Sequence, residues 1–176
     1  MPIELCLPGE FNMGNATVAL AAATAVLGID PAVAAKAFKQ VDTVASRYAM
    51  IEHGRHRLRL LLAKNPAGWT QTLPLLDPAS ALLLVVNARE ADGRDASWLW
   101  NVPFERLTPA RGARSVVAAG ERAADLGLRL AYAHVEHRTV PDPLAALAEM
   151  ADGDVDVVAN YTAFPALSRR IAQTSR

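Results

Sequence analysis

Two short polar segments carry the residue types that could do chemistry, and each follows an apolar run of strand length. The first is Lys64-Asn65-Pro66, in which Asn65 can cap a helix that begins at Pro66. The free N–H groups of a helix start, with Lys64 beside them, favour a phosphate. An ordinary helix cap with a solvated lysine is the alternative that this segment leaves open.

The second segment runs from residue 87 to residue 100 and carries Asp92 and Asp95. Carboxylates at the end of a strand can orient a histidine or hold a magnesium ion. Equally, Asp92-Gly93 can form a turn, and Asp95 can cap a short helix whose tryptophans fill the core. Residue types alone do not separate these interpretations.

A third polar segment lies at 159–164, where Asn160 or Thr162 could cap the last helix with Phe164 packed inward. The chain has no phosphate-binding loop of the G-x-x-x-x-G-K-[ST] type, no dinucleotide-binding glycine motif and no nucleophile elbow. Its histidines and its one cysteine show no zinc-binding spacing, so we predict no metal site.

The elements that must position these segments alternate between strand and helix. This alternation predicts an α/β fold, with a Rossmann-like, mostly parallel sheet covered by helices on both faces. A helical hairpin over 12–27 and 32–40 precedes it, and strands 47–52 and 55–63 form an antiparallel edge. The remaining strands are expected at 81–87, 115–118, 128–132 and 155–158, and the remaining helices at 65–75, 120–126, 143–150 and 164–173.

The order of the elements also predicts where the polar segments meet. Ligands of open parallel sheets gather at the carboxyl ends of the strands. The loops that start at Lys64 and Asn87 should therefore leave the same rim of one sheet, side by side. A weak boundary at 41–46 separates the helical segment, 1–45, from the sheet domain, 46–176.

Composition excludes several classes of protein. The chain has 176 residues, 52% of them hydrophobic, with 18 basic and 18 acidic side chains and a formal net charge of zero. Nucleic-acid binders normally carry a basic excess, so none is expected here. The amino terminus lacks the basic region of a signal peptide, and the apolar run at 79–86 is far shorter than the ~20 residues of a membrane span. We expect a cytoplasmic protein without a transmembrane segment, cut from a longer chain.

Several motifs resemble those of the Mur ligase family. The segment Gly9-Glu10-Phe11-Asn12-Met13-Gly14-Asn15-Ala16 resembles the G-x-(H/F)-N-x-x-N-A motif that opens a helix leading out of the ATPase domain. Arg47 resembles the arginine that begins the first strand of the next domain. Taken together, AKNPAGW, ADGRDASWLW and ANYTAF resemble the MurT branch, the ligase-like subunits of lipid II isoglutaminyl synthase.

This resemblance implies both architecture and activity. Residues 1–45 would be the end of the Mur ligase central domain, and 46–176 its Rossmann-like carboxyl-terminal domain. The family uses ATP and magnesium to activate the D-glutamate α-carboxylate of lipid II as an acyl phosphate. A glutaminase partner of the GatD type supplies the ammonia that converts this carboxylate to the amide of D-isoglutamine.

The resemblance also assigns roles to individual residues. Asn12 and Asn15 would meet the adenine side of the nucleotide, and Arg47 its ribose. Lys64 and Asn65 would face the phosphates and the acyl phosphate. An aspartate of the ligase subunit would complete the triad of the glutaminase by orienting its histidine. The candidates are Asp92 and Asp95.

Departures from the family pattern limit what the chain can do alone. It lacks the phosphate-binding ATPase domain and the four-cysteine zinc ribbon, and Lys64 stands where other Mur ligases have a histidine. The aspartate before that motif is Leu61 or Leu62 here. We therefore expect no ATPase or amidation activity from this chain by itself. Two alternatives are a non-catalytic Rossmann-like protein-interaction module and a small-molecule binder that uses the Lys64 loop.

Overall fold

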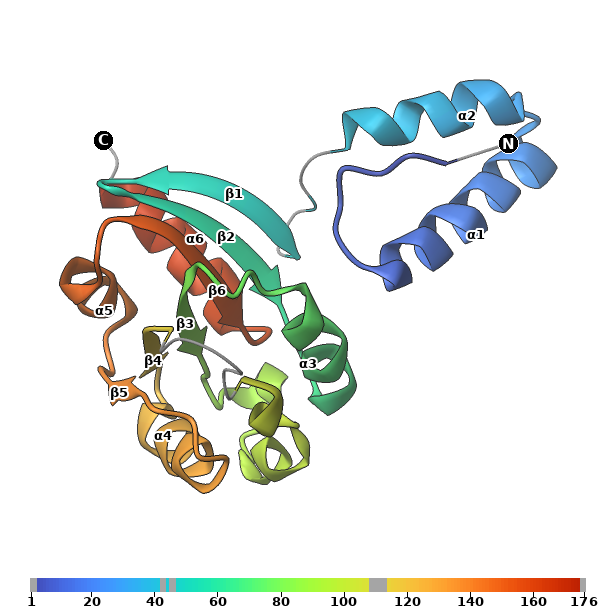
Figure 1. The fold of residues 1–176 in the computed structure, drawn as a ribbon. Coiled ribbons are helices and arrows are strands. Elements are labelled where there is room, and N and C mark those ends of the chain that lie inside the picture. The colour runs from blue at the N-terminus through green and yellow to red at the C-terminus, as the bar shows by residue number, and fades with distance from the viewer. Residues whose placement is uncertain (1–2, 42–43, 45–46, 108–113, 175–176) are drawn as a thin grey trace. The chain divides into compact units, whose positions relative to one another are not determined.

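The computed structural model describes residues 3–41, 44, 47–107 and 114–174. The chain divides into two compact units, Met1–Ala45 and Ser46–Arg176 (Figure 1). Each unit is described by itself below.

The first unit is a helical hairpin built on local capping signals. Helix α1 (Glu10–Leu27) ends at Gly28, whose φ of 65° is the left-handed conformation that glycine adopts at little cost. Helix α2 (Pro31–Ala37) begins at Asp30, whose carboxylate accepts hydrogen bonds from the amides of Ala32 and Val33, and a 3₁₀ turn (Phe38–Gln40) follows. The hairpin predicted from the sequence is confirmed. No helix in the described ranges is both long and apolar enough to cross a membrane.

The second unit is built on one sheet, and six strands form it among the residues described. Their order is β1-β2-β6-β3-β4-β5 (Figure 1). Strands β1 and β2 pair antiparallel through a turn at Gly54, and all the other pairs are parallel. The strands are β1 (Tyr48–His53), β2 (His56–Leu62), β3 (Ala81–Val85), β4 (Val116–Ala119), β5 (Arg138–Thr139) and β6 (Gly153–Ala159).

Side chains that alternate along the strands build a separate core on each face of this sheet. In β3, Leu82 and Leu84 pack with residues of α3 (Pro66–Thr72) and α4 (Ala123–Tyr132). Leu83 and Val85 point to the other face and pack with residues of α5 (Pro143–Glu149) and α6 (Ala163–Thr174). Because both faces are covered, β3 and β4 in the middle of the sheet are apolar throughout. The predicted α/β fold, with helices on both faces of a mostly parallel sheet, is confirmed.

The carboxyl ends of the parallel strands lie level along one rim. Ala159, the last residue of β6, pairs with Leu62 at the end of β2 and with Val85 at the end of β3. Val85 in turn pairs with Ala119, the last residue of β4. The loops that start at Lys64 and Asn87 therefore leave the same rim, as predicted. They do not lie side by side, however, because β6 and the loop after it stand between them.

One predicted strand was wrong. Residues 128–132 belong to α4, where Leu126 and Leu130 are fully buried while Leu128 is 55% and Tyr132 67% exposed. Burial four residues apart is the period of a helix, whereas the short apolar run had suggested a strand. The strand that pairs with β4 is instead β5, which has two exposed residues and no apolar signal in the sequence.

Candidate functional site

The carboxyl rim of the sheet gathers most of the candidate residues. Arg47 lies just before β1, and its carbonyl oxygen accepts a hydrogen bond of 2.9 Å from the amide of Leu62 at the end of β2. The Lys64 loop follows β2, the Tyr161 loop follows β6 and the Asn87 segment follows β3. The rim thus has two sides, separated by the end of β6. We call the side with Arg47 and Lys64 the cationic side, and the side with Asp92 and Asp95 the acidic side.

Two buried asparagines join the loops at the centre of this rim. The side chain of Asn160 accepts a hydrogen bond from the Asn87 amide at 3.0 Å and donates one to the Asn87 carbonyl at 2.8 Å. The side chain of Asn87 in turn accepts from the Glu121 amide at 3.1 Å, which adds the loop after β4. Asn160 and Asn87 are 1% and 7% exposed, so these bonds replace hydration that neither group can obtain from solvent. Hydrogen bonds between buried side chains and backbone therefore join the loops after β6, β3 and β4.

On the cationic side, the Lys64 ammonium lies 4.9 Å from the centre of the Tyr161 ring, within the range of a cation–π contact. Both side chains reach solvent, and Tyr161 is 46% exposed. Asn65 caps α3, because its Oδ1 accepts a 2.9 Å hydrogen bond from the Gly68 amide. The predicted cap is confirmed, and it occupies the side-chain oxygen of Asn65.

On the acidic side, Asp92 faces into the protein. Its carboxylate accepts hydrogen bonds from the Thr162 amide at 3.0 Å, from the Thr162 hydroxyl and from the Arg89 amide at 3.1 Å. Asp92 therefore links the segment after β3 to the start of α6. Its half-buried position leaves it less open to a partner than Asp95.

Asp95 lies on the surface. In the described structure its carboxylate accepts two local hydrogen bonds, from the Ser97 amide at 2.8 Å and from the Ser97 hydroxyl at 2.7 Å. These two bonds, with a smaller contribution from the charge of Arg122, hold the pKa of Asp95 below its usual value. The carboxylate is thus ionised at neutral pH and exposed, in front of the 3₁₀ turn Ser97–Asn101.

The tryptophans that follow Asp95 have different environments. Trp98 is half-buried, and its ring centre lies 6.3 Å from that of the buried Trp69 on α3. Trp100, in contrast, is 51% exposed. The alternative in which both tryptophans fill the core is therefore wrong for Trp100. Phe164 is 2% exposed and does pack inward, as predicted for the start of α6.

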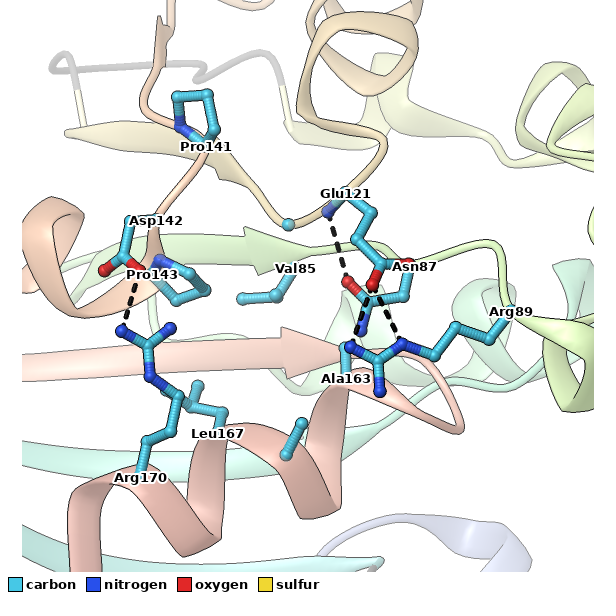
Figure 2. A pocket seen from close by; sticks show the side chains of 12 residues that line it. Val85, Asn87, Arg89, Glu121, Pro141, Asp142, Pro143, Ala163, Leu167 and Arg170 are labelled. Carbon is cyan, nitrogen blue, oxygen red and sulfur yellow. Dashed lines mark hydrogen bonds and ion pairs between the residues drawn. The ribbon is translucent and has the colours of Figure 1, made fainter. Parts of the chain in front are cut away.

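A hollow of about 410 Å³ lies at the same rim, between the ends of β3 and β4, the loop after β5, and α6. Two ion pairs border it, Arg89 with Glu121 and Arg170 with Asp142 (Figure 2). Arg89 lies in the predicted polar segment at 87–100, whereas Asp142 was not predicted as a site residue, because the strand before it, β5, has no apolar signal in the sequence. The available signal was Asp142-Pro143, which repeats the cap-and-proline pattern at the starts of α2 and α3.

Asn12 and Asn15 belong to the first unit, where both lie on α1. The Asn12 amide group donates a 2.6 Å hydrogen bond to the carbonyl of Pro8, and Asn15 is exposed. The rim therefore holds the other five predicted residues, which are Arg47, Lys64, Asn65, Asp92 and Asp95.

Within the ranges that the structure describes, no three His, Cys, Asp or Glu side chains form a cluster suited to a metal ion.

Comparison with known proteins identifies relatives for most of the chain. Residues 62–164 match the family model described as "MurT ligase C-terminal". The lipid II isoglutaminyl synthase (glutamine-hydrolyzing) subunit MurT of Staphylococcus aureus strain COL is 32% identical over 138 residues, which are 76% of this chain and 31% of that protein. The MurT subunit of Streptococcus pneumoniae is 33% identical over 125 residues, or 69% of this chain and 28% of that protein. The chain thus spans about a third of the length of these curated relatives.

Solved structures support the fold. UDP-N-acetylmuramate-alanine ligase MurC of Thermotoga maritima matches 100% of this chain and 41% of its own with a TM-score of 0.69 at 16% identity. The UDP-N-acetylmuramoylalanyl-D-glutamyl-2,6-diaminopimelate–D-alanyl-D-alanyl ligase of Acinetobacter baumannii matches 97% of this chain and 38% of its own with a TM-score of 0.68 at 17% identity. At these identities the likeness establishes a shared fold only.

Proposed function

This chain belongs to the family of MurT ligase C-terminal domains, and on that premise we propose that it is part of the ATP-dependent ligase subunit of a lipid II isoglutaminyl synthase. With a glutaminase partner of the GatD type, that enzyme would amidate the D-glutamate α-carboxylate of lipid II to D-isoglutamine. The observation that carries the proposal is the rim, on which a cationic loop and an acidic segment flank the end of β6. Ligase chemistry and ammonia supply both need a place in such an enzyme, and the two sides of the rim offer one for each.

The cationic side suits the nucleotide in part. Lys64 and Arg47 are exposed positive side chains at neighbouring strand ends, where they could meet phosphates and ribose. Asn65 would contribute by capping α3 and thereby fixing the loop that carries Lys64. When bound, ATP supplies the phosphoryl group that turns a carboxylate, a poor electrophile, into an activated acyl group. Asn12 and Asn15, in the first unit, are proposed to meet the adenine.

The described residues offer no binding site for magnesium. The described acidic side chains form no cluster suited to the ion, and Asp92 is engaged by Thr162 and Arg89. We therefore assign no magnesium ligand to the described residues. The phosphate-binding loop that the sequence lacks would likewise have to come from outside these residues.

On the acidic side, the geometry favours Asp95 over Asp92 as the aspartate that serves the glutaminase. A carboxylate that orients a histidine of another subunit must be ionised and must reach that subunit. Asp95 meets both conditions, because it is exposed and hydrogen bonds from Ser97 lower its pKa. It would accept a hydrogen bond from the imidazole Nδ1–H and stabilise the imidazolium formed when the histidine takes a proton. Asp92 would instead hold the acidic segment against α6.

Measuring glutamine hydrolysis by the complex of this chain and its glutaminase partner tests the assignment. We expect Asp95→Asn to lower kcat by a factor on the order of 10² to 10⁴, because the amide presents neither the charge nor two equivalent acceptors. Asp152→Asn is the matched control, since Asp152 is an exposed aspartate just before β6, at the opposite rim of the sheet. Activity unchanged by both Asp95→Asn and Asp92→Asn would favour the alternative, a non-catalytic interaction module.

A further inference from the structure

An exposed aromatic cluster lies beside Asp95. Trp100 and Tyr132 are 51% and 67% exposed, and their rings meet edge to face with centres 5.2 Å apart. Leu128, 55% exposed on α4, borders a depression of about 250 Å³ that Trp100 and Asp95 also line. Single exposed apolar side chains are common on protein surfaces, but adjoining large ones mark interaction sites. We name Trp100, Leu128 and Tyr132 the aromatic patch.

The buried side chain of Arg129 holds Trp100 of the aromatic patch in place. The guanidinium of Arg129 lies 5.7 Å from the centre of the Trp100 ring, and Arg129 itself is only 5% exposed. It donates hydrogen bonds to the Val102 carbonyl at 2.7 Å and to the Glu105 carboxylate at 2.8 Å. Trp100 thus rests on an anchored cation and packs against Tyr132. A tryptophan fixed before binding loses little side-chain entropy on association, which is the property of an interface hot spot.

The position of the aromatic patch next to Asp95 indicates which protein would cover it. Asp95, Trp100 and Leu128 line one depression, so a protein that places a histidine on Asp95 must also cover the other two side chains. Arg122 and Asp125 lie at the border of the depression. They would supply the charged periphery that surrounds the apolar centre of many interfaces.

We propose that the aromatic patch is the docking hot spot for the glutaminase subunit, an inference that rests on the proposed function. Trp100 and Leu128 would be buried at the centre of that interface, and Asp95 would lie at its edge in contact with the partner's histidine. The patch would thus determine affinity, whereas Asp95 would act as a positioning residue for glutamine hydrolysis. A second copy of this chain is the competing occupant.

The test measures the Kd between the full chain and the glutaminase subunit from the same organism, together with kcat at saturating chain. Trp100→Ser and Leu128→Arg should each raise Kd at least tenfold, or about 1.4 kcal/mol, and leave kcat at saturation within about threefold of wild type. Leu128→Arg retains a good helix former at an exposed position and so should not unfold the chain. Asp95→Asn should show the opposite pattern, with a nearly unchanged Kd and a low kcat.

Met50→Gln serves as the control, because Met50 is 46% exposed on β1, away from the patch residues in sequence and on a different element. Patch variants that bind within twofold of wild type, or that lose no more affinity than Met50→Gln, would overturn the docking inference. So would self-association of the wild-type chain in sedimentation experiments that both patch variants abolish while glutaminase binding persists. A wild-type chain that does not bind the glutaminase at all would instead refute the proposed function.

Discussion

Replacing Asn160 by alanine should destabilise the sheet unit more than any exposed asparagine would. The change removes the hydrogen bonds of 3.0 and 2.8 Å that Asn160 makes to the backbone of Asn87. Each bond contributes about 1 kcal/mol net, and a buried amide or carbonyl left without a partner costs about 1–3 kcal/mol. Because Asn87 is only 7% exposed, we expect Asn160→Ala to lower the free energy of unfolding by about 2–4 kcal/mol.

Urea unfolding followed by tryptophan fluorescence measures this cost, since Trp69 is buried in the core and Trp98 packs on it. The expected loss corresponds to a fall in Tm of roughly 6–12 °C for a domain of this size. Asn101→Ala is the control, because Asn101 is exposed and should change stability by less than about 0.5 kcal/mol. Equal effects of the two substitutions would refute the idea that Asn160 locks the rim.

Three further predictions concern other parts of the chain. Gly120 has a φ of 96°, and an added Cβ would lie 2.4 Å from the Val86 carbonyl oxygen, so Gly120→Ala should cost at least about 2–3 kcal/mol in the same unfolding assay. A hydrogen bond from the Ala145 amide, with a further contribution from Arg170, holds the pKa of Asp142 below its ordinary value of 3.8. Asp142 therefore stabilises the fold above about pH 4, and that contribution is lost as the pH falls further, so Asp142→Asn should flatten the acid decline of the unfolding free energy between about pH 5 and 2. The purified chain alone should hydrolyse no ATP and amidate no lipid II, which a phosphate-release assay with ATP, glutamine and lipid II would contradict by detecting turnover.

The sequence predicted those features that depend on local signals. The caps at Asp30 and Asn65, each followed by a proline, give the helix starts directly. The apolar run of β3 and its place between helices give a buried parallel strand, and the level strand ends follow from that topology. The rim could therefore be predicted without coordinates.

Other features depend on contacts that no local pattern reveals. Asn160 and Asn87 are 73 positions apart in the sequence, and nothing in either segment predicts that they bind each other. The run at 128–132 is short and apolar like a strand, and its pattern of burial in the structure shows that it belongs to a helix. Asp92 and Asp95 are equivalent as residue types, yet one carboxylate is engaged by Thr162 and the other is exposed.

The central claim is that the carboxyl rim of the sheet is the functional edge of this domain. Amide chemical-shift mapping of the labelled chain during titration with the glutaminase subunit tests it most directly. We predict that the largest shifts fall on residues 92–101 and 125–132, with smaller changes near Tyr161. Shifts confined to the opposite rim, at the turn around Gly54 and at Gly153, would contradict the claim.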